Sequence, residues 1–168
     1  MSILLLFSLV LFSLLCSAFF SGMEIAFISS NKLKIELDNN KGEIGAKILS
    51  YFSDKPAWFI ATMLVGNNIA LVIYTLYMAV LLDPYLMAAG LGSSSILLLQ
   101  TIFSTIFILI FAEFLPKAIF RLNPNFILKL FSGILLVFYI LLWPITALVV
   151  YLTRVILRFF GKEDGSCL

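Results

Sequence analysis

Long apolar runs constrain this chain more than any other feature. Residues 3–28, 58–82, 95–119 and 126–153 are apolar almost throughout, and 62% of the 168 residues are hydrophobic while only 12% are charged. About 20 apolar residues in an α-helix suffice to cross the hydrocarbon core of a bilayer, which is about 30 Å thick. This composition lies far from that of a globular domain. The chain is therefore predicted to be an all-α integral membrane protein with one compact domain.

Composition also excludes several functions. The chain has no histidine, its net charge is +2, and Cys16 and Cys167 lie near opposite ends. A histidine-based metal site, a zinc motif and a disulfide framework are therefore not expected. The basic residues form no patch for nucleic acid, so no nucleic-acid partner is expected. No nucleophile–base pair or phosphate loop is visible, so we do not expect an enzyme.

Charged residues between the runs predict the topology. Residues 29–55 are rich in lysine, whereas the connection 83–94 holds no lysine or arginine. The positive-inside rule places residues 29–55 in the cytoplasm and the N-terminus outside. The first run lacks a basic leader and continues to Ile28, so we expect a retained helix and not a signal peptide. The apolar residues between 29 and 55, interrupted at 38–42, predict two short amphipathic helices on the membrane surface; they are Leu33, Leu37, Ile44, Ile48 and Phe52.

The last apolar run conflicts with this topology. If residues 126–153 crossed the membrane, the basic residues that follow would lie outside. A belt-like helix in the cytoplasmic interface, bent at Pro144 and anchored by Tyr139, Trp143 and Tyr151, fits the charges better. A crossing helix stays open as the alternative, because about 24 uncharged residues follow from Leu130.

The predicted fold is thus three transmembrane helices, amphipathic juxtamembrane helices and a C-terminal belt-like interfacial helix. These occupy a domain of residues 1–160, followed by a tail at 161–168. No internal repeat is evident, so a two-fold arrangement requires dimerisation. We expect a multi-pass protein of the cell (inner or plasma) membrane with its C-terminus in the cytoplasm.

Glu113 is the most informative polar residue, because a carboxylate at membrane depth costs about 2.5–3.5 kcal/mol unless something compensates it. Three residues later, Pro116 has no N–H to donate to the carbonyl of Ala112. A carboxylate and a freed carbonyl form half of a site for a hard cation. Counted from the cytoplasmic ends, Ser21, Asn67 and Asn68 fall in the same layer of the inner leaflet.

Further residues extend this layer, and each has a structural alternative. Ser21 and Glu24 lie one turn apart, while Gly22 and Gly66 allow close approach. Ser21 and the asparagines could instead serve helix packing, and Glu24 could extend towards the interface. Glu113 could also form a structural salt bridge with Lys117 four residues on. The donors are all oxygen, which favours Mg²⁺, Ca²⁺, Mn²⁺ or Na⁺ over Zn²⁺. Two carboxylates match one divalent or two monovalent ions.

Three motifs carry a resemblance to a known family. They are FSGMEIAF at residues 20–27, LVGNN at 64–68 and AEFLPK at 112–117. Their order and spacing resemble those of the transmembrane domain of CorC/CNNM (cyclin M) magnesium transporters. The family usually has glycine where this chain has Ala112, which leaves a carbonyl ligand intact.

The resemblance implies a homodimer with three crossing helices and a cytoplasmic belt helix in each subunit. It implies that Mg²⁺ binds in a cytoplasm-facing site and is exported, with Na⁺ as counter-ion. The implied Mg²⁺ ligands are Ser21, Asn67 or Asn68, the Ala112 carbonyl and Glu113. Glu24, with Gly22 and Gly66, would lie in a Na⁺ site or behind the ligands. Relatives usually continue into cytoplasmic CBS modules, which this sequence does not show. The alternative function is a membrane module that senses Mg²⁺ or serves as a scaffold without moving ions.

Overall fold

The computed structural model describes residues 2–90 and 92–159, and every regular element within them is helical. The helices follow in the order α1 (Ile3–Ser29), α2 (Lys32–Asn40), α3 (Ile44–Asp54), α4 (Pro56–Ala88), α5 (Ser93–Phe107), η1 (Ile108–Phe114), α6 (Leu115–Leu122) and α7 (Pro124–Phe159). The segment η1 is a π-helix. The predicted all-α fold is confirmed.

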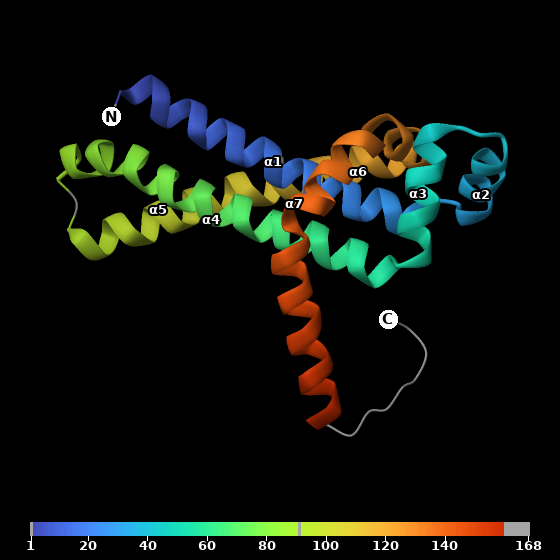
Figure 1. The fold of residues 1–168 in the computed structure, drawn as a ribbon. Helices are drawn as coiled ribbons and strands as arrows, with labels where there is room; N and C mark the ends of the chain where they lie inside the picture. Colours follow the sequence, from blue (N-terminus) through green and yellow to red (C-terminus); the bar gives the residue numbers. More distant parts are fainter. Residues whose placement is uncertain (1, 91, 160–168) are drawn as a thin grey trace.

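Three long helical rods form the body of the molecule. Figure 1 shows α1, α4 and α5 running side by side, with the N-terminus and the α4–α5 connection at one end and α2 and α3 at the other. Helix α1 packs against α4, against η1 and α6, and against α7. It is therefore the helix that brings α4, η1, α6 and α7 together.

Helix α7 has a different direction. It continues through Pro144 without a break, and its second half, red in Figure 1, runs across the direction of α1 and α4. By length and composition alone, four helices of the described chain could cross a membrane, including residues 124–157. The count thus exceeds the three predicted spans by one, because α7 is as apolar as the others. A belt helix in the membrane interface would run in this direction, across the helices that cross the bilayer.

An aromatic cluster joins α7 to the bundle. Phe59 of α4 packs on Phe27 of α1 and on Phe52 of α3, with ring centroids 4.2 Å and 5.0 Å apart. Phe52 also lies 5.0 Å from Tyr139 of α7. Four helices therefore share one buried contact at the end of the molecule where α2 and α3 lie.

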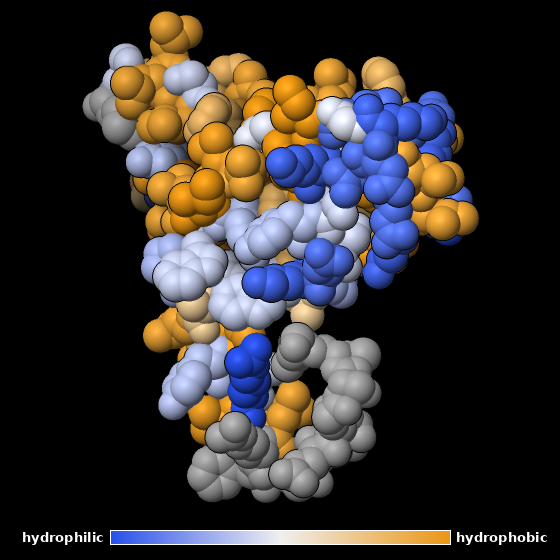
Figure 2. Space-filling view, turned by 45° about the vertical axis from the view of Figure 1, so that its right-hand side comes forward, coloured by the Kyte–Doolittle hydropathy of each residue, from blue (hydrophilic) through white to orange (hydrophobic). Residues whose placement is uncertain are grey.

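Helices α2 and α3 form the predicted pair, separated by a turn at Gly42 with a φ of +82°. The buried side chains of α2 are Ile35 and Asp38, while Leu33 and Leu37 are exposed. Of the apolar residues from which the pair was predicted, Leu33, Leu37 and Ile44 therefore face away from the protein, where lipid can cover them. Figure 2 shows hydrophilic side chains gathered over this end of the molecule and hydrophobic surface over much of the rest.

Candidate functional site

A hydrogen bond joins α1 and α4 at the polar layer, the level predicted to contain Ser21, Asn67, Asn68 and Glu113. The Ser17 hydroxyl donates to Oδ1 of Asn67 at 2.6 Å, and both residues are buried. Asn68 is exposed, and its Nδ2 donates to the carbonyl of Leu64 in its own helix at 2.9 Å. Of the two predicted asparagines, Asn67 thus faces α1, whereas Asn68 points away from it.

Ser21 lies one turn beyond Ser17 on the same side of α1. Its hydroxyl is fully buried and has no hydrogen-bond partner among the described residues. A buried polar group without a partner costs about 1–3 kcal/mol. The oxygen of this hydroxyl is therefore available to a further group, one helical turn from Ser17.

Two glycines allow the helices to approach at this layer. A Cβ added at Gly66 would lie 2.7 Å from the Phe20 ring of α1. A Cβ at Gly22 would lie 2.8 Å from the Phe120 ring of α6. Phe20 of α1 therefore contacts α4, while Gly22 of the same helix contacts α6, so α1 links the motifs at residues 64–68 and 112–117.

Ala112 and Glu113 belong to the π-helix η1. The Leu115 N–H donates to the carbonyl of Ile110, five residues earlier, as π-helical geometry requires. Pro116 follows in the first turn of α6, where it is buried. Since Pro116 has no N–H, the carbonyl of the fully buried Ala112 lacks its α-helical donor. Single π turns inside α-helices occur frequently at functional sites.

The charged residues of the layer lie close to one another. The Lys117 ammonium is 3.8 Å from a carboxylate oxygen of Glu113, and the two side chains are 43% and 34% exposed. This long, partly exposed contact is the predicted salt-bridge alternative, and it leaves the Glu113 carboxylate accessible. Glu24 of α1 lies within electrostatic reach of both Lys117 and Glu113. The layer therefore combines two carboxyl groups with one amino group.

The donor set fits a hard cation. In the described part of the chain, no group of three or more Asp, Glu, Cys or His side chains could hold a metal. A cation here would depend on the hydroxyl of Ser21, the amide of Asn67, the carbonyl of Ala112 and the carboxylate of Glu113. Oxygen donors of this mixed kind suit Mg²⁺, Ca²⁺ and Na⁺.

Ser17 was absent from the predicted site. Its signal was available, because Ser13, Ser17 and Ser21 repeat every four residues in a helix that is mostly apolar. All three are buried, and Ser13 donates to the Leu9 carbonyl of its own helix at 2.8 Å. The serine repeat marks the side of α1 that faces the protein.

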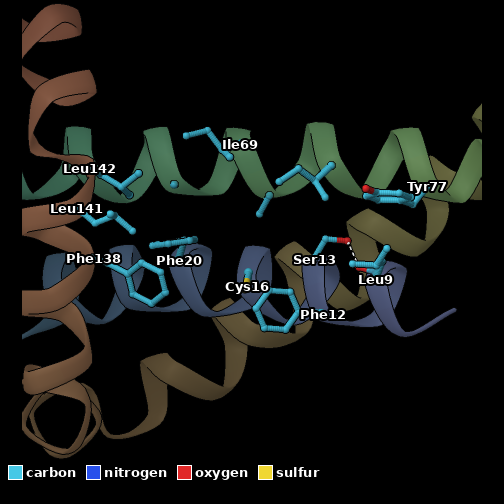
Figure 3. Close-up of a pocket in the computed structure, with 13 residues that line it drawn as sticks. Leu9, Phe12, Ser13, Cys16, Phe20, Ile69, Tyr77, Phe138, Leu141 and Leu142 are labelled. Atoms are coloured by element: carbon cyan, nitrogen blue, oxygen red, sulfur yellow. Dashed lines mark hydrogen bonds between the residues drawn. The ribbon is translucent and has the colours of Figure 1, made fainter. Parts of the chain in front are cut away.

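An apolar groove of about 430 Å³ flanks this layer between α1 and α4. Figure 3 shows Cys16 and Phe20 of α1 on one side, Ile69 of α4 on the other, and Phe138 and Leu142 of α7 at one end. None of its lining residues is charged, and its polar side chains are those of Ser13, Cys16 and Tyr77. The polar layer is therefore separated from this side of the molecule by hydrophobic side chains.

The fold and this layer define a helical integral membrane domain with an oxygen-lined polar layer at membrane depth. The family model of the cyclin M transmembrane N-terminal domain matches residues 8–167, so the chain belongs to the CNNM (cyclin M) family. The predicted family is confirmed.

Bacterial relatives agree with this assignment. The chain is 29% identical over 136 residues to the UPF0053 protein MG146 homolog of Mycoplasma pneumoniae, covering 79% of this chain and 31% of the relative. It is 29% identical over 149 residues to the UPF0053 inner membrane protein YfjD of Escherichia coli, covering 88% of this chain and 33% of the relative. A UPF0053 protein of Haemophilus influenzae is 27% identical over 142 residues, which are 82% of this chain and 32% of that protein. The chain thus spans about a third of the length of these relatives.

Proposed function

We propose that this domain binds Mg²⁺ from the cytoplasm in the layer between α1, α4 and η1 and exports it in exchange for Na⁺. The observation that carries the proposal is the buried hydroxyl of Ser21, which has no hydrogen-bond partner among the described residues. It lies on α1, the helix that bonds to Asn67 of α4 through Ser17 and packs against the π-helix that contains Glu113. Membership in the cyclin M family supports Mg²⁺ as the cargo. The name of the E. coli relative supports a location in the inner membrane.

Each ligand has a defined part in this proposal. Glu113 supplies the charge that attracts Mg²⁺, and Lys117 has to give way, which its long contact allows. Ser21, Asn67 and the Ala112 carbonyl replace part of the ion's water shell. Asn67, and not Asn68, is the ligand in the second motif, because only Asn67 is directed at α1. Glu24 provides the second carboxylate, which would favour Na⁺ when Mg²⁺ leaves.

The proposed orientation has the N-terminus outside and α2 and α3 in the cytoplasm. The described structure supports it, because the N-terminus and the lysine-free α4–α5 connection lie at the same end of the bundle. The proposed assembly is a homodimer, in line with the absence of an internal repeat.

The test is Mg²⁺ flux in proteoliposomes that contain a trapped Mg²⁺-sensitive dye, with and without an opposing Na⁺ gradient. Glu113→Gln should abolish both the flux and the Mg²⁺-dependent rise in melting temperature. Glu36→Gln is the matched control, because the Glu36 carboxylate is exposed on α2, a helix that contributes no residue to the layer. Wild-type Mg²⁺ binding by Glu113→Gln would refute the assigned site. Binding without flux would favour the sensor or scaffold function.

A further inference from the structure

A second pocket lies outside the ion layer, where α3 ends, α4 begins and α7 passes. Its volume is about 490 Å³. Four aromatic side chains form its walls, namely Tyr51, Trp58, Tyr139 and Trp143. Tyr51 and Tyr139 meet edge to face, with centroids 6.2 Å apart. The charged residues at the pocket are Asp54, Lys55 and Arg154.

The two basic side chains have no salt-bridge partner in residues 2–90 and 92–159. Neither Lys55 nor Arg154 forms an ion pair among the described residues, although Asp54 lies in the same lining. The Lys55 ammonium instead lies 5.3 Å from the centroid of the Tyr51 ring. An ammonium over an aromatic face is held in place and still has donors for a further partner.

The backbone adds to this positive potential. Lys55 is the N-cap of α4, and its side chain makes no capping hydrogen bond. The first turn of this 33-residue helix therefore presents free N–H groups and the positive end of the helix dipole beside the pocket. Phosphate groups are favoured at such positions.

The aromatic residues around the pocket indicate that a phosphate bound there would belong to a lipid headgroup. Tryptophan and tyrosine concentrate at the level of lipid headgroups, where one side of the ring is apolar and the other is wet. Further along the same two helices, α4 and α7, the apolar groove of Figure 3 could accept an acyl chain. Basic pockets between membrane helices bind lipid headgroups in this way.

We propose that this pocket holds the headgroup phosphate of a glycerophospholipid, in the leaflet next to α2 and α3. Lys55 and Arg154 bind the phosphate, and the aromatic walls hold the glycerol and the rest of the headgroup. The bound lipid would join α3, the start of α4 and α7, and so fix the direction of α7. The site is independent of the ion layer, so it can be tested without transport.

The test is native mass spectrometry of the delipidated chain titrated with phosphatidylglycerol, phosphatidylethanolamine or diacylglycerol. Lys55→Gln combined with Arg154→Gln should weaken phospholipid binding by about tenfold or more, since both positive charges that bind the phosphate are removed. The matched control is Lys32→Gln combined with Lys47→Gln, which removes the same charge from exposed positions of α2 and α3. The control should bind like the wild type, and diacylglycerol, which lacks phosphate, should not be retained.

Three outcomes would overturn the proposal. One is equal affinity of the two double variants for phospholipid. Another is retention of diacylglycerol as strong as that of phospholipid. The third is displacement of the lipid by millimolar inorganic phosphate, which would assign the pocket to free phosphate. Trp143→Leu provides a further variant on an exposed wall residue, and it should weaken phospholipid binding while leaving the helical content unchanged.

Discussion

At the scale of single residues, Ser21 combines a cost in stability with the proposed role in binding. Its buried hydroxyl has no partner within the described part of the chain, so Ser21→Ala should raise the melting temperature in Mg²⁺-free buffer or leave it unchanged. The same change should reduce the further rise that Mg²⁺ causes, because a ligand is lost. Ser13→Ala is the control, since the Ser13 hydroxyl already bonds to its own helix. If Ser21→Ala responded to Mg²⁺ like the wild type, the hydroxyl would not be a ligand.

Gly66 carries the other residue-level prediction. An added methyl group would meet the Phe20 ring at 2.7 Å, and overpacking of this kind costs about 1–3 kcal/mol. Gly66→Ala should therefore lower the melting temperature. Gly133→Ala is matched to it, because Gly133 is also helical and has open space around its Cβ position. A second change, Phe20→Leu, should partly restore the stability of Gly66→Ala. Equal melting temperatures for the two alanine variants would contradict the close packing of α1 and α4.

At the scale of elements, salt bridges from Lys129 connect the α2–α3 pair to α7. Its ammonium binds the carboxylate of Asp38 and lies 2.8 Å from that of Glu43. The hydrogen bond from Lys129 lowers the pKa of Asp38 below the ordinary value of 3.8. A carboxyl group with a lowered pKa in the folded state adds stability above its ordinary pKa, and this stability is lost as the pH falls towards the lower value.

Asp38→Asn combined with Lys129→Met should therefore be less stable than the wild type at neutral pH. The difference in melting temperature should shrink as the pH falls below 3.8. Melting curves in detergent between pH 7 and pH 3 measure this. The control is Asp54→Asn combined with Lys47→Met, which alters the same charges outside the ion pair. A difference that stayed constant down to pH 3 would show that Asp38 does not carry the pH dependence.

The same elements show what local sequence can predict. The runs that form α1, α4 and α5 and the break at Gly42 follow from hydropathy and turn chemistry, which act within a few residues. The buried side of α2 could not be predicted from local sequence, because Asp38 is buried through its contact with Lys129, which lies 91 residues away in the sequence. Likewise, Pro116 predicted a freed carbonyl but not the seven-residue π-helix. The Ser17–Asn67 hydrogen bond depends on how α1 and α4 are rotated about their axes relative to each other. The sequence of one helix does not determine this rotation.

At the scale of the whole molecule, the direction of α7 decides how many times the chain crosses the membrane. Its 36 residues extend about 54 Å at about 1.5 Å per residue, enough to span a bilayer. However, its second half runs across α1 and α4, and a helix in that direction lies along the membrane when they cross it. The aromatic contacts of Tyr139 and the pocket at Arg154 tie α7 to the ends of α3 and α4, the end proposed to be cytoplasmic.

We therefore expect Thr153 to lie on the same side of the membrane as Arg121, in the last turn of α6, and on the side opposite to Ser94. Single cysteines at these three exposed positions, in a background with Cys16 and Cys167 replaced by serine, can be labelled in intact cells with an impermeant maleimide. Only Ser94→Cys should react from outside, while Arg121→Cys and Thr153→Cys should react after the cells are opened. If Thr153→Cys also reacted from outside, α7 would cross the membrane. Arg154 would then face outside, and a phospholipid bridging α3 and α7 would be geometrically impossible, so this single result bears on both the topology and the lipid site.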